Sequence, residues 1–285
     1  MIKILYVHGY NGKPDGESFK KLAKYAEAEH FGGEKVEMHS FEYDATQPSK
    51  AIRALELYYY ENNIDLIIGS SLGGFLAAMC NWTRRIVVNP CWSPSTELPK
   101  VGYTESVEKY NFQEKYLGHY AEDGDSQLCI GCFAPQDELL GLKYKEDFCK
   151  HFPETYDIPG GHHLSEEAAR KIMTEIAPML IARFKASKGA GEITGKGLNE
   201  TQRLFYAHML SIYNEPSIKK SDKCGCFYCE RVFPASIVDE TAIEPGNNPD
   251  TALCPYCGID SVLADADWKD LSPEFLKKMY EYFFN

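Results

Sequence analysis

Short apolar runs alternate with segments of helical spacing over the first 186 residues of the chain. The runs are rich in β-branched residues and almost uniformly hydrophobic, which is typical of parallel strands buried on both faces. They cover Ile2–Val7, Lys35–Phe41, Asp65–Ile68, Arg85–Val88, Gln127–Phe133 and Thr155–Ile158. Helical spacing recurs over Ser18–Ala28, Ser49–Tyr60, Leu72–Trp82, Glu138–His151 and Glu166–Phe184. This alternation predicts an α/β fold, a mostly parallel sheet with helices on both faces.

One segment, at about residues 91–126, breaks the alternation. It has no clean period but is rich in aromatic residues, from Trp92 to Tyr120. Because ligands of open α/β sheets bind at the carboxyl ends of the strands, an insertion after a strand is well placed to form a lid. The alternative is a surface excursion that packs on its own aromatic side chains.

The composition changes after residue 186. Residues 187–198 are rich in glycine and lysine and lack a hydrophobic period, which predicts a linker. Residues 199–285 then predict a small second domain. It opens with an amphipathic helix over Asn199–Tyr213, contains two pairs of cysteines, and closes with a helix that Ser272 can cap.

The composition narrows the function classes. The formal net charge is −12, spread over both parts of the chain, so neither part has the basic character of a nucleic-acid binder or of a protein that binds anionic membranes. No run approaches the roughly 18 apolar residues of a membrane span, and the first residues resemble a strand and not a signal peptide. We therefore expect a cytoplasmic protein whose ten cysteines are reduced.

A candidate nucleophile lies in the sequence Gly69-Ser70-Ser71-Leu72-Gly73, which fits G-x-S-x-G. A predicted strand precedes it and a predicted helix follows it. In this setting a sharp turn exposes the Ser71 hydroxyl at the carboxyl edge of the sheet, and the flanking glycines avoid clashes. Ser71 is therefore the predicted nucleophile, and Ser70 is expected to be structural. The alternative is a small-residue turn needed only for close packing.

The base and the acid should follow the serine in the order Ser, Asp or Glu, His. Asp137 lies beyond the fifth predicted strand and is the preferred acid, with Glu138 as its rival. A glycine-rich loop beyond the last strand ends in His162 and His163, and either histidine fits the role of base. His8 precedes the serine, so we expect it to brace the first loop.

Acyl transfer also requires donors for the oxyanion. One is predicted to be the backbone N–H of Leu72, the residue after the nucleophile. The loop His8-Gly9-Tyr10-Asn11-Gly12 follows the first strand, and its glycines let the backbone approach a ligand. The N–H of Tyr10 is the preferred second donor, and that of Asn11 is the alternative.

Several motifs of residues 1–186 together carry a family resemblance. HGYNGKPDGES, GSSLGGFLA, VVNPCWSP, APQDELL and PGGHHLSEE occur in this order. The set resembles small bacterial esterases of the α/β-hydrolase fold that were long filed as an uncharacterised protein family. By position, the resemblance implies Ser71 as nucleophile, Asp137 as acid and His163 as base. The family usually has an amide residue where this chain has His162.

Two cysteine pairs, Cys226-x2-Cys229 and Cys254-x2-Cys257, are separated by 24 residues. In a reducing compartment, two such pairs predict a tetrahedral and closed structural Zn²⁺ site, with disulfides as the alternative. Cys224 is a spare ligand with poorer spacing. A further C-x-x-C, Cys129 to Cys132, lies inside a predicted strand, where we expect buried structural thiols and not redox chemistry.

Residues 220–285 resemble small bacterial cytoplasmic proteins of unknown function that look like zinc ribbons, which implies metal binding. The leading hypothesis is a serine hydrolase that cleaves a small-molecule ester or thioester without a catalytic cofactor, while the ribbon docks or binds a protein partner. One alternative is an inactive hydrolase scaffold that acts as a zinc-ribbon adaptor. The other is a peptidase or amidase that uses the same triad.

Overall fold

The computed structural model describes residues 1–119, 121, 125–187, 200–238 and 251–284. The chain divides into two compact units, Met1–Gly195 and Lys196–Asn285. The linker predicted at 187–198 lies, from residue 188 onward, outside the described residues, as does Tyr120 of the predicted lid.

The first unit is built on a six-stranded sheet whose neighbouring strands all pair in parallel. Its spatial order is β2-β1-β3-β4-β5-β6. The strands are β1 (Ile2–Val7), β2 (Val36–Phe41), β3 (Leu66–Ser70), β4 (Arg85–Val88), β5 (Cys129–Phe133) and β6 (Thr155–Asp157). All six coincide with the apolar runs of the sequence, so the predicted α/β fold class is confirmed.

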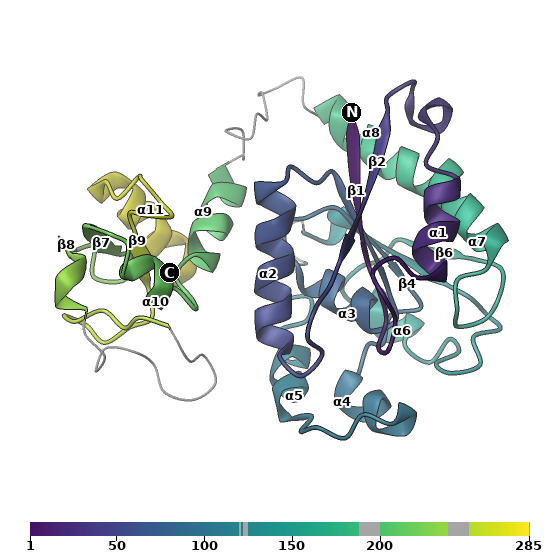
Figure 1. Cartoon of the computed structure of the whole chain (residues 1–285), viewed down its shortest axis with the longest axis horizontal. Coiled ribbons are helices and arrows are strands. Elements are labelled where there is room, and N and C mark those ends of the chain that lie inside the picture. The colour runs from purple at the N-terminus through teal and green to yellow at the C-terminus, as the bar shows by residue number, and fades with distance from the viewer. Residues whose placement is uncertain (120, 122–124, 188–199, 239–250, 285) are drawn as a thin grey trace. The chain divides into compact units, whose positions relative to one another are not determined.

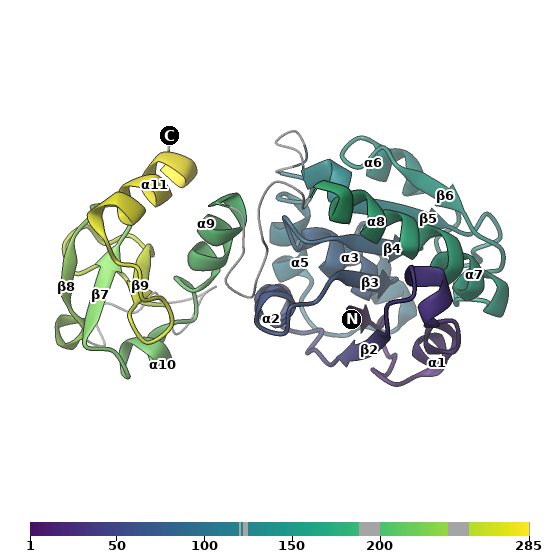
Figure 2. The ribbon, with the colours of Figure 1, turned by 90° about the horizontal axis from the view of Figure 1, so that it is seen from above.

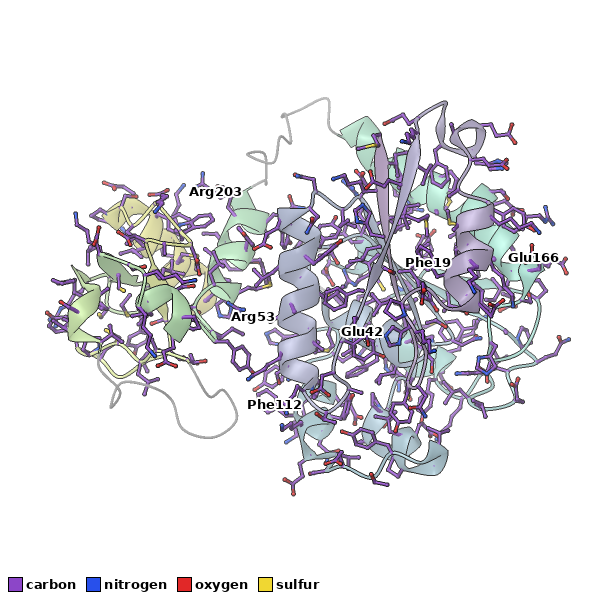
Figure 3. The ribbon with its side chains drawn as sticks, in the orientation of Figure 1. Phe19, Glu42, Arg53, Phe112, Glu166 and Arg203 are labelled. Atoms are coloured by element: carbon purple, nitrogen blue, oxygen red, sulfur yellow. The ribbon has the colours of Figure 1, made fainter. Side chains whose placement is uncertain are left out.

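Helices cover both faces of this sheet (Figures 1 and 2). One face packs against α1 (Glu17–Lys24) and the helical stretch formed by α7 (Glu166–Lys171), the π-helical turn η4 (Ile172–Ile176) and α8 (Ala177–Ser187). The other face carries α2 (Pro48–Glu61) and α3 (Leu72–Met79). Phe19, labelled in Figure 3, shows the packing of α1: its ring centroid lies 6.3 Å from that of Tyr6 on β1.

The segment after β4 is folded, not extended. It contains α4 (Pro94–Glu97), η2 (Leu98–Val101), α5 (Glu108–Glu114) and η3 (Asp125–Leu128). Tyr110 is fully buried, and its hydroxyl donates to the carbonyl of Ala45 at 2.7 Å. Glu97 accepts hydrogen bonds from Lys143 and Tyr144, which lie beyond β5. These contacts anchor the segment on the unit.

One predicted helix is much shorter in the structure. The spacing over Glu138–His151 predicts a long helix, but only α6 (Lys145–Cys149) forms. The reason lies at Asp137, whose Oδ1 accepts from the N–H groups of Leu139 and Leu140 at 2.8 Å each and holds the chain in a turn. Gly141 then adopts a positive φ of 57°, which a continuing helix would not allow.

A buried ion pair lies at the amino end of β4. The Arg85 guanidinium contacts Asp125 through both nitrogen branches, with Nη1 3.0 Å from Oδ1, and both side chains are fully buried. Asp125 also accepts from the N–H of Trp82, so the pair fastens the end of the insertion to the sheet. Glu56 of α2 is buried nearby and accepts from the N–H of Asn81 at 3.1 Å.

The second unit has a three-stranded antiparallel sheet in the order β8-β7-β9. Its strands are β7 (Lys223–Cys226), β8 (Val232–Pro234) and β9 (Val262–Ala264). Helices α9 (Glu200–Met209), α10 (Glu215–Ile218) and α11 (Pro273–Phe284) and the short helix η6 (Ala235–Ile237) belong to the same unit. The first unit also contains the short helix η1 (Ala28–Phe31). The Ser272 hydroxyl accepts from the N–H of Phe275 at 3.3 Å, as its predicted capping role requires.

Across the described residues, none of the helices combines the length and the apolar character that crossing a membrane requires.

Candidate functional site

Ser71 occupies a sharp turn between β3 and α3. Its backbone has φ 53° and ψ −118°, a region that L-residues rarely adopt. Its N–H donates to the carbonyl of Val88 on β4 at 2.9 Å, and its carbonyl accepts from Phe75 and Cys91. The strained turn is thus held by the neighbouring strand and helix, and it presents the hydroxyl at the carboxyl edge of the sheet, as the G-x-S-x-G pattern predicts.

The glycines around Ser71 are required by close backbone contacts. A Cβ at Gly73 would lie 2.3 Å from the carbonyl oxygens of Val7 and His8, and one at Gly69 would lie 2.3 Å from the carbonyl oxygen of Gly73. A Cβ at Gly9 would approach the Cβ of Ser71 to 3.0 Å. The loop after β1 therefore packs directly against the serine turn.

His162 is the histidine that faces the serine. Its Nε2 lies 3.0 Å from the Oγ of Ser71, and its Nδ1 lies 2.9 Å from Oδ2 of Asp137. A carboxylate only accepts, so Nδ1 carries the proton and Nε2 is free to accept from the serine hydroxyl. The structure thus brings together a serine hydroxyl, an imidazole and a carboxylate in the geometry that acyl transfer uses.

The prediction that His163 takes this position is wrong in the structure. His163 is exposed, whereas His162 is 6% exposed and forms both hydrogen bonds. The reason is local: Gly160 has φ 107°, and the loop closes through a bridge between Gly160 and Leu164. Within this tight turn, consecutive side chains point in different directions, and the ring centroids of the two histidines lie 5.8 Å apart. The turn directs His162 inward and leaves His163 at the rim.

The surroundings of Asp137 keep its carboxylate ionised. Burial by itself raises the pKa of this side chain, but hydrogen bonds from His162 and from the N–H groups of Leu140 and Leu139 outweigh it, so the pKa lies below its usual value. Glu138, the rival acid, has a different place: it accepts from the backbone N–H of His162 at 2.9 Å. It holds the histidine loop and does not contact the imidazole nitrogens.

Asn89, at the end of β4, is a site residue that sequence reasoning missed. Its Nδ2 donates to the carbonyls of Gly161 and His162 at 3.1 and 3.2 Å, and its Oδ1 accepts from the N–H of Ala134 at 2.7 Å. It therefore ties the histidine loop to the loop that leads to Asp137. The asparagine stands in the VVNPCWSP motif, but the sequence contains no sign of its partners.

Leu72 and Tyr10, the residues predicted to donate to the oxyanion, both lie next to Ser71 or in the loop that packs against it. Leu72 is the first residue of α3, and the loop that contains Tyr10 lies against Ser71 through Gly9. Outside the regular helices and strands of the described residues, no backbone carbonyl accepts from the N–H of Tyr10, and Leu72 lies in the first turn of α3, where N–H groups have no partner within the helix. His8 braces this loop: its Nδ1 lies 2.8 Å from the carbonyl oxygen of Gly9, and its ring stacks on Tyr43.

A cleft of about 470 Å³ opens over Ser71 and His162. The loop after β1 and helix α1 line one part of it, with Tyr10, Lys13 and Lys21. Val101 of the folded insertion and Leu139 of the loop after β5 line it as well. The insertion thus contributes a side chain to the cleft, while its movement as a lid stays a prediction.

The second unit holds a cluster of four cysteine sulfur atoms, from Cys226, Cys229, Cys254 and Cys257, which all lie within 4.8 Å of one another. The sulfur atoms of Cys226 and Cys257 are 3.7 Å apart, as are those of Cys229 and Cys254. Four thiolates in a tetrahedron around one zinc ion, each ~2.3 Å from it, would be ~3.8 Å from one another. The donor set and its spacing therefore fit a zinc ion, and the spare Cys224 is not in the cluster.

The family model described as "Uncharacterised protein family (UPF0227)" matches residues 3–149, just over half of the 285 residues. The chain belongs to this family. The region that the UPF0227 model matches contains Ser71 and Asp137 and ends before His162. Among curated proteins, no match to the chain was found.

Solved structures resemble part of this UPF0227 member. A putative hydrolase of the alpha/beta superfamily from Xanthomonas campestris pv. campestris is 18% identical, with a TM-score of 0.40 and a match that covers 66% of this chain and 99% of that chain. Est1E from Butyrivibrio proteoclasticus is 15% identical, with a TM-score of 0.44 and coverages of 66% and 88%. The esterase domain of a Rhodothermus marinus protein is 12% identical, with a TM-score of 0.47 and coverages of 64% and 87%.

Proposed function

We propose that the first unit is a serine hydrolase that cleaves a small ester or thioester through an acyl-enzyme on Ser71. The observation that carries the proposal is the pair of hydrogen bonds at His162, one to Ser71 at 3.0 Å and one to Asp137 at 2.9 Å. The strained turn at Ser71 and the chain order Ser, Asp, His add support, because both are typical of the α/β-hydrolase fold.

The chemistry follows from the positions of these groups. His162 Nε2 takes the proton of the Ser71 hydroxyl as the oxygen attacks the substrate carbonyl, and then gives the proton to the leaving group. Asp137 accepts from Nδ1 and stabilises the imidazolium that forms. Water then attacks the acyl-enzyme, with His162 as its base, and frees Ser71.

The charge that develops on the carbonyl oxygen needs donors that are already in place. The backbone N–H groups of Leu72 and Tyr10 serve this role in the proposal, one from the start of α3 and one from the loop after β1. The positive end of the α3 dipole adds to the stabilisation. The side chains and backbone groups of the chain thus supply every role that these steps require.

The first test is labelling with a fluorophosphonate, followed by intact-mass measurement. The wild-type chain should gain a single adduct and the Ser71→Ala variant none, while Ser70→Ala, one position earlier in the same turn, should still be labelled. Turnover of p-nitrophenyl acetate should fall by about a thousandfold or more in Ser71→Ala. Labelling of the Ser71→Ala variant at the wild-type rate would contradict the proposal.

The same triad also serves amide hydrolysis, so the bond cleaved needs its own comparison. Matched ester, thioester and anilide substrates with one acyl group separate the cases. The proposal requires the ester or thioester to be turned over faster than the anilide by more than their intrinsic reactivities explain. A preference for the anilide would make the protein an amidase.

For the second unit, we propose that Cys226, Cys229, Cys254 and Cys257 bind one structural zinc ion. The zinc would cross-link the two cysteine turns. It would not act on the substrate, because four thiolate ligands leave no open coordination position. The backbone contributes as well: the N–H of Cys229 donates to the sulfur of Cys226 at 3.4 Å. A unit this small gains folding energy from such a site.

A further inference from the structure

The cleft over Ser71 has an excess of positive charge, although the chain as a whole carries −12. Lys13, in the loop after β1, and Lys21, on α1, both line it. Among the described residues that line the cleft, the one acidic residue is Glu17. Its carboxylate already accepts from Lys20 at 3.0 Å, on the exposed side of α1. The carboxylate that would balance the two lysines is therefore already paired.

Lys21 has a fixed position in the cleft. Its Nζ donates to the carbonyl of Leu164 at 2.9 Å, two residues after His162. An ammonium has three N–H donors, so two remain for a ligand. The nearby carboxylate of Glu166, labelled in Figure 3, accepts from Lys24 and from Tyr25. The lysine is thus held beside the histidine loop by a neutral carbonyl. Glu166 acts on its charge only through space, because this carboxylate is hydrogen-bonded to Lys24 and Tyr25.

Lys13 is exposed, and in the described part of the chain no carboxylate lies within ion-pair distance of its Nζ. The turn that carries it is defined: the N–H of Gly16 donates to the carbonyl of Lys13 at 3.0 Å. Lys13 follows the proposed oxyanion donor Tyr10 by three residues. It therefore stands on the same loop that faces the reacting carbonyl.

Other elements contribute apolar surface to the same cleft. Val101 and Leu139 line it and remain 46% and 52% exposed, although the core would be the ordinary place for such side chains. The two lysines come from the β1–α1 region, whereas these two side chains come from the insertion and from the loop after Asp137. The cleft thus combines a cationic part with an apolar part around one serine.

We propose that the substrate is an ester or thioester that carries an anionic group, bound by Lys13 and Lys21, together with an apolar group that contacts Val101 and Leu139. This inference rests on the proposed hydrolase function and specifies its substrate class. Each ion pair at such a partly exposed position stabilises the complex modestly, so each lysine should contribute about threefold to tenfold in kcat/KM. Added salt should weaken this contribution.

The test uses two pairs of esters in which a carboxylate replaces a carboxamide of the same shape. In one pair, the mono-p-nitrophenyl esters of adipic acid and of its monoamide, the charge lies on the acyl side. In the other, the acetate esters of p-hydroxyphenylacetic acid and of its amide, the charge lies on the leaving side. The ratio of kcat/KM for the charged ester to that for the neutral ester is the readout, so changes that affect both substrates alike cancel.

In at least one pair, the wild-type chain should favour the carboxylate, and the ratio should fall in Lys13→Met and in Lys21→Met. It should fall further in the double variant and at high salt. Lys50→Met, on α2 and outside the cleft, should leave the ratio unchanged. If neutral esters are turned over with no preference for the carboxylate in either pair, or if the double variant keeps the preference, the charge proposal is wrong and the hydrolase proposal stands. If no ester is turned over, the proposed function itself fails.

Discussion

The side-chain amide of Asn89 donates to the backbone carbonyl of His162, a residue 73 positions later in the chain, at 3.2 Å. The same side chain accepts from the N–H of Ala134, in the loop that leads to Asp137. Asn89 therefore links the two loops that carry the proposed base and the proposed acid. It lies at the end of the central strand β4 and adopts a positive φ of 41°, which asparagine tolerates well. We therefore propose that Asn89 is a positioning residue, which acts on Ser71 only by holding His162 in place.

Substitution of Asn89 should therefore impair the activation of Ser71. In Asn89→Asp, an oxygen replaces the amide nitrogen and faces two carbonyl oxygens, which removes both donated bonds and repels the histidine loop. We expect kcat to fall by about tenfold to a hundredfold with a smaller change in KM. The rate of fluorophosphonate labelling, which depends on the serine and its base, should fall in parallel. Unchanged labelling would show that the amide only stabilises the fold.

The two adjacent histidines provide a direct comparison. His162→Ala removes the group within hydrogen-bond distance of Ser71, and ester turnover should fall by about a thousandfold or more. His163→Ala removes an exposed ring that does not contact Ser71, and turnover should stay within a few fold of the wild type. Circular dichroism of both variants checks that the fold is kept. The opposite ranking would return the role of base to His163.

The stability of the first unit should depend on the protonation of Glu56. Burial raises the pKa of its carboxyl from 4.5 to about 8, and the hydrogen bond from Asn81 and the charge of Arg85 offset only part of this effect. The folded chain therefore holds this proton more tightly than the unfolded chain. The free energy of unfolding should then decrease as the pH rises from about 4.5 to about 8.

Replacement of Glu56 by glutamine tests this expectation. The amide side chain would be a neutral acceptor for the N–H of Asn81 at every pH, so Glu56→Gln should match the wild type near pH 5 and exceed it near pH 9, by a free energy on the order of 3 kcal/mol. Urea unfolding at the two pH values measures the difference. Glu61→Gln, at the exposed end of the same helix, is the control. Equal stability of Glu56→Gln and wild type at the higher pH would contradict the assignment.

The zinc proposal predicts close to one zinc per chain after purification without chelators, measured by elemental analysis. Cys226→Ala should lower the zinc content and loosen the second unit, because three thiolates bind the ion less tightly than four. Cys224→Ala, two residues earlier on the same strand β7, should keep the zinc, since Cys224 lies outside the cluster. Zinc loss in Cys224→Ala but not in Cys226→Ala would reverse the assignment of ligands.

The sheet could be predicted from the sequence because parallel strands buried on both faces appear as continuous apolar runs. Each of the six runs forms a strand within a few residues of its expected bounds. The shortening of the helix over Glu138–His151 could not be predicted, because apolar spacing does not reveal that the side chain of Asp137 accepts backbone hydrogen bonds from the next residues. In this region the Asp137 side chain competes with the backbone carbonyls for these N–H groups, and the helix therefore does not begin here.

The serine and its turn were predictable because their pattern is local, a strand, five residues and a helix. The choice between His162 and His163 was not, because it depends on the direction of one side chain at the end of a glycine-rich loop. The role of Asn89 depends on partners more than 40 residues away, which spacing along the chain does not encode. The pairing of Cys226 with Cys229, like the serine turn, could be predicted because the two residues are close in sequence, and the structure places both in the sulfur cluster.

The order of the strands along the chain also decides when the site is assembled during synthesis. Ser71 follows β3, and the histidine that contacts it comes 91 residues later, after the edge strand β6. At ordinary elongation rates of about 5–20 residues per second, the ribosome needs about 5 to 20 seconds to cover this interval. During this time the nascent chain contains Ser71 but not the histidine that contacts it. The site is completed only when β6 adds to the sheet, and the cysteine unit is still to be synthesised at that moment.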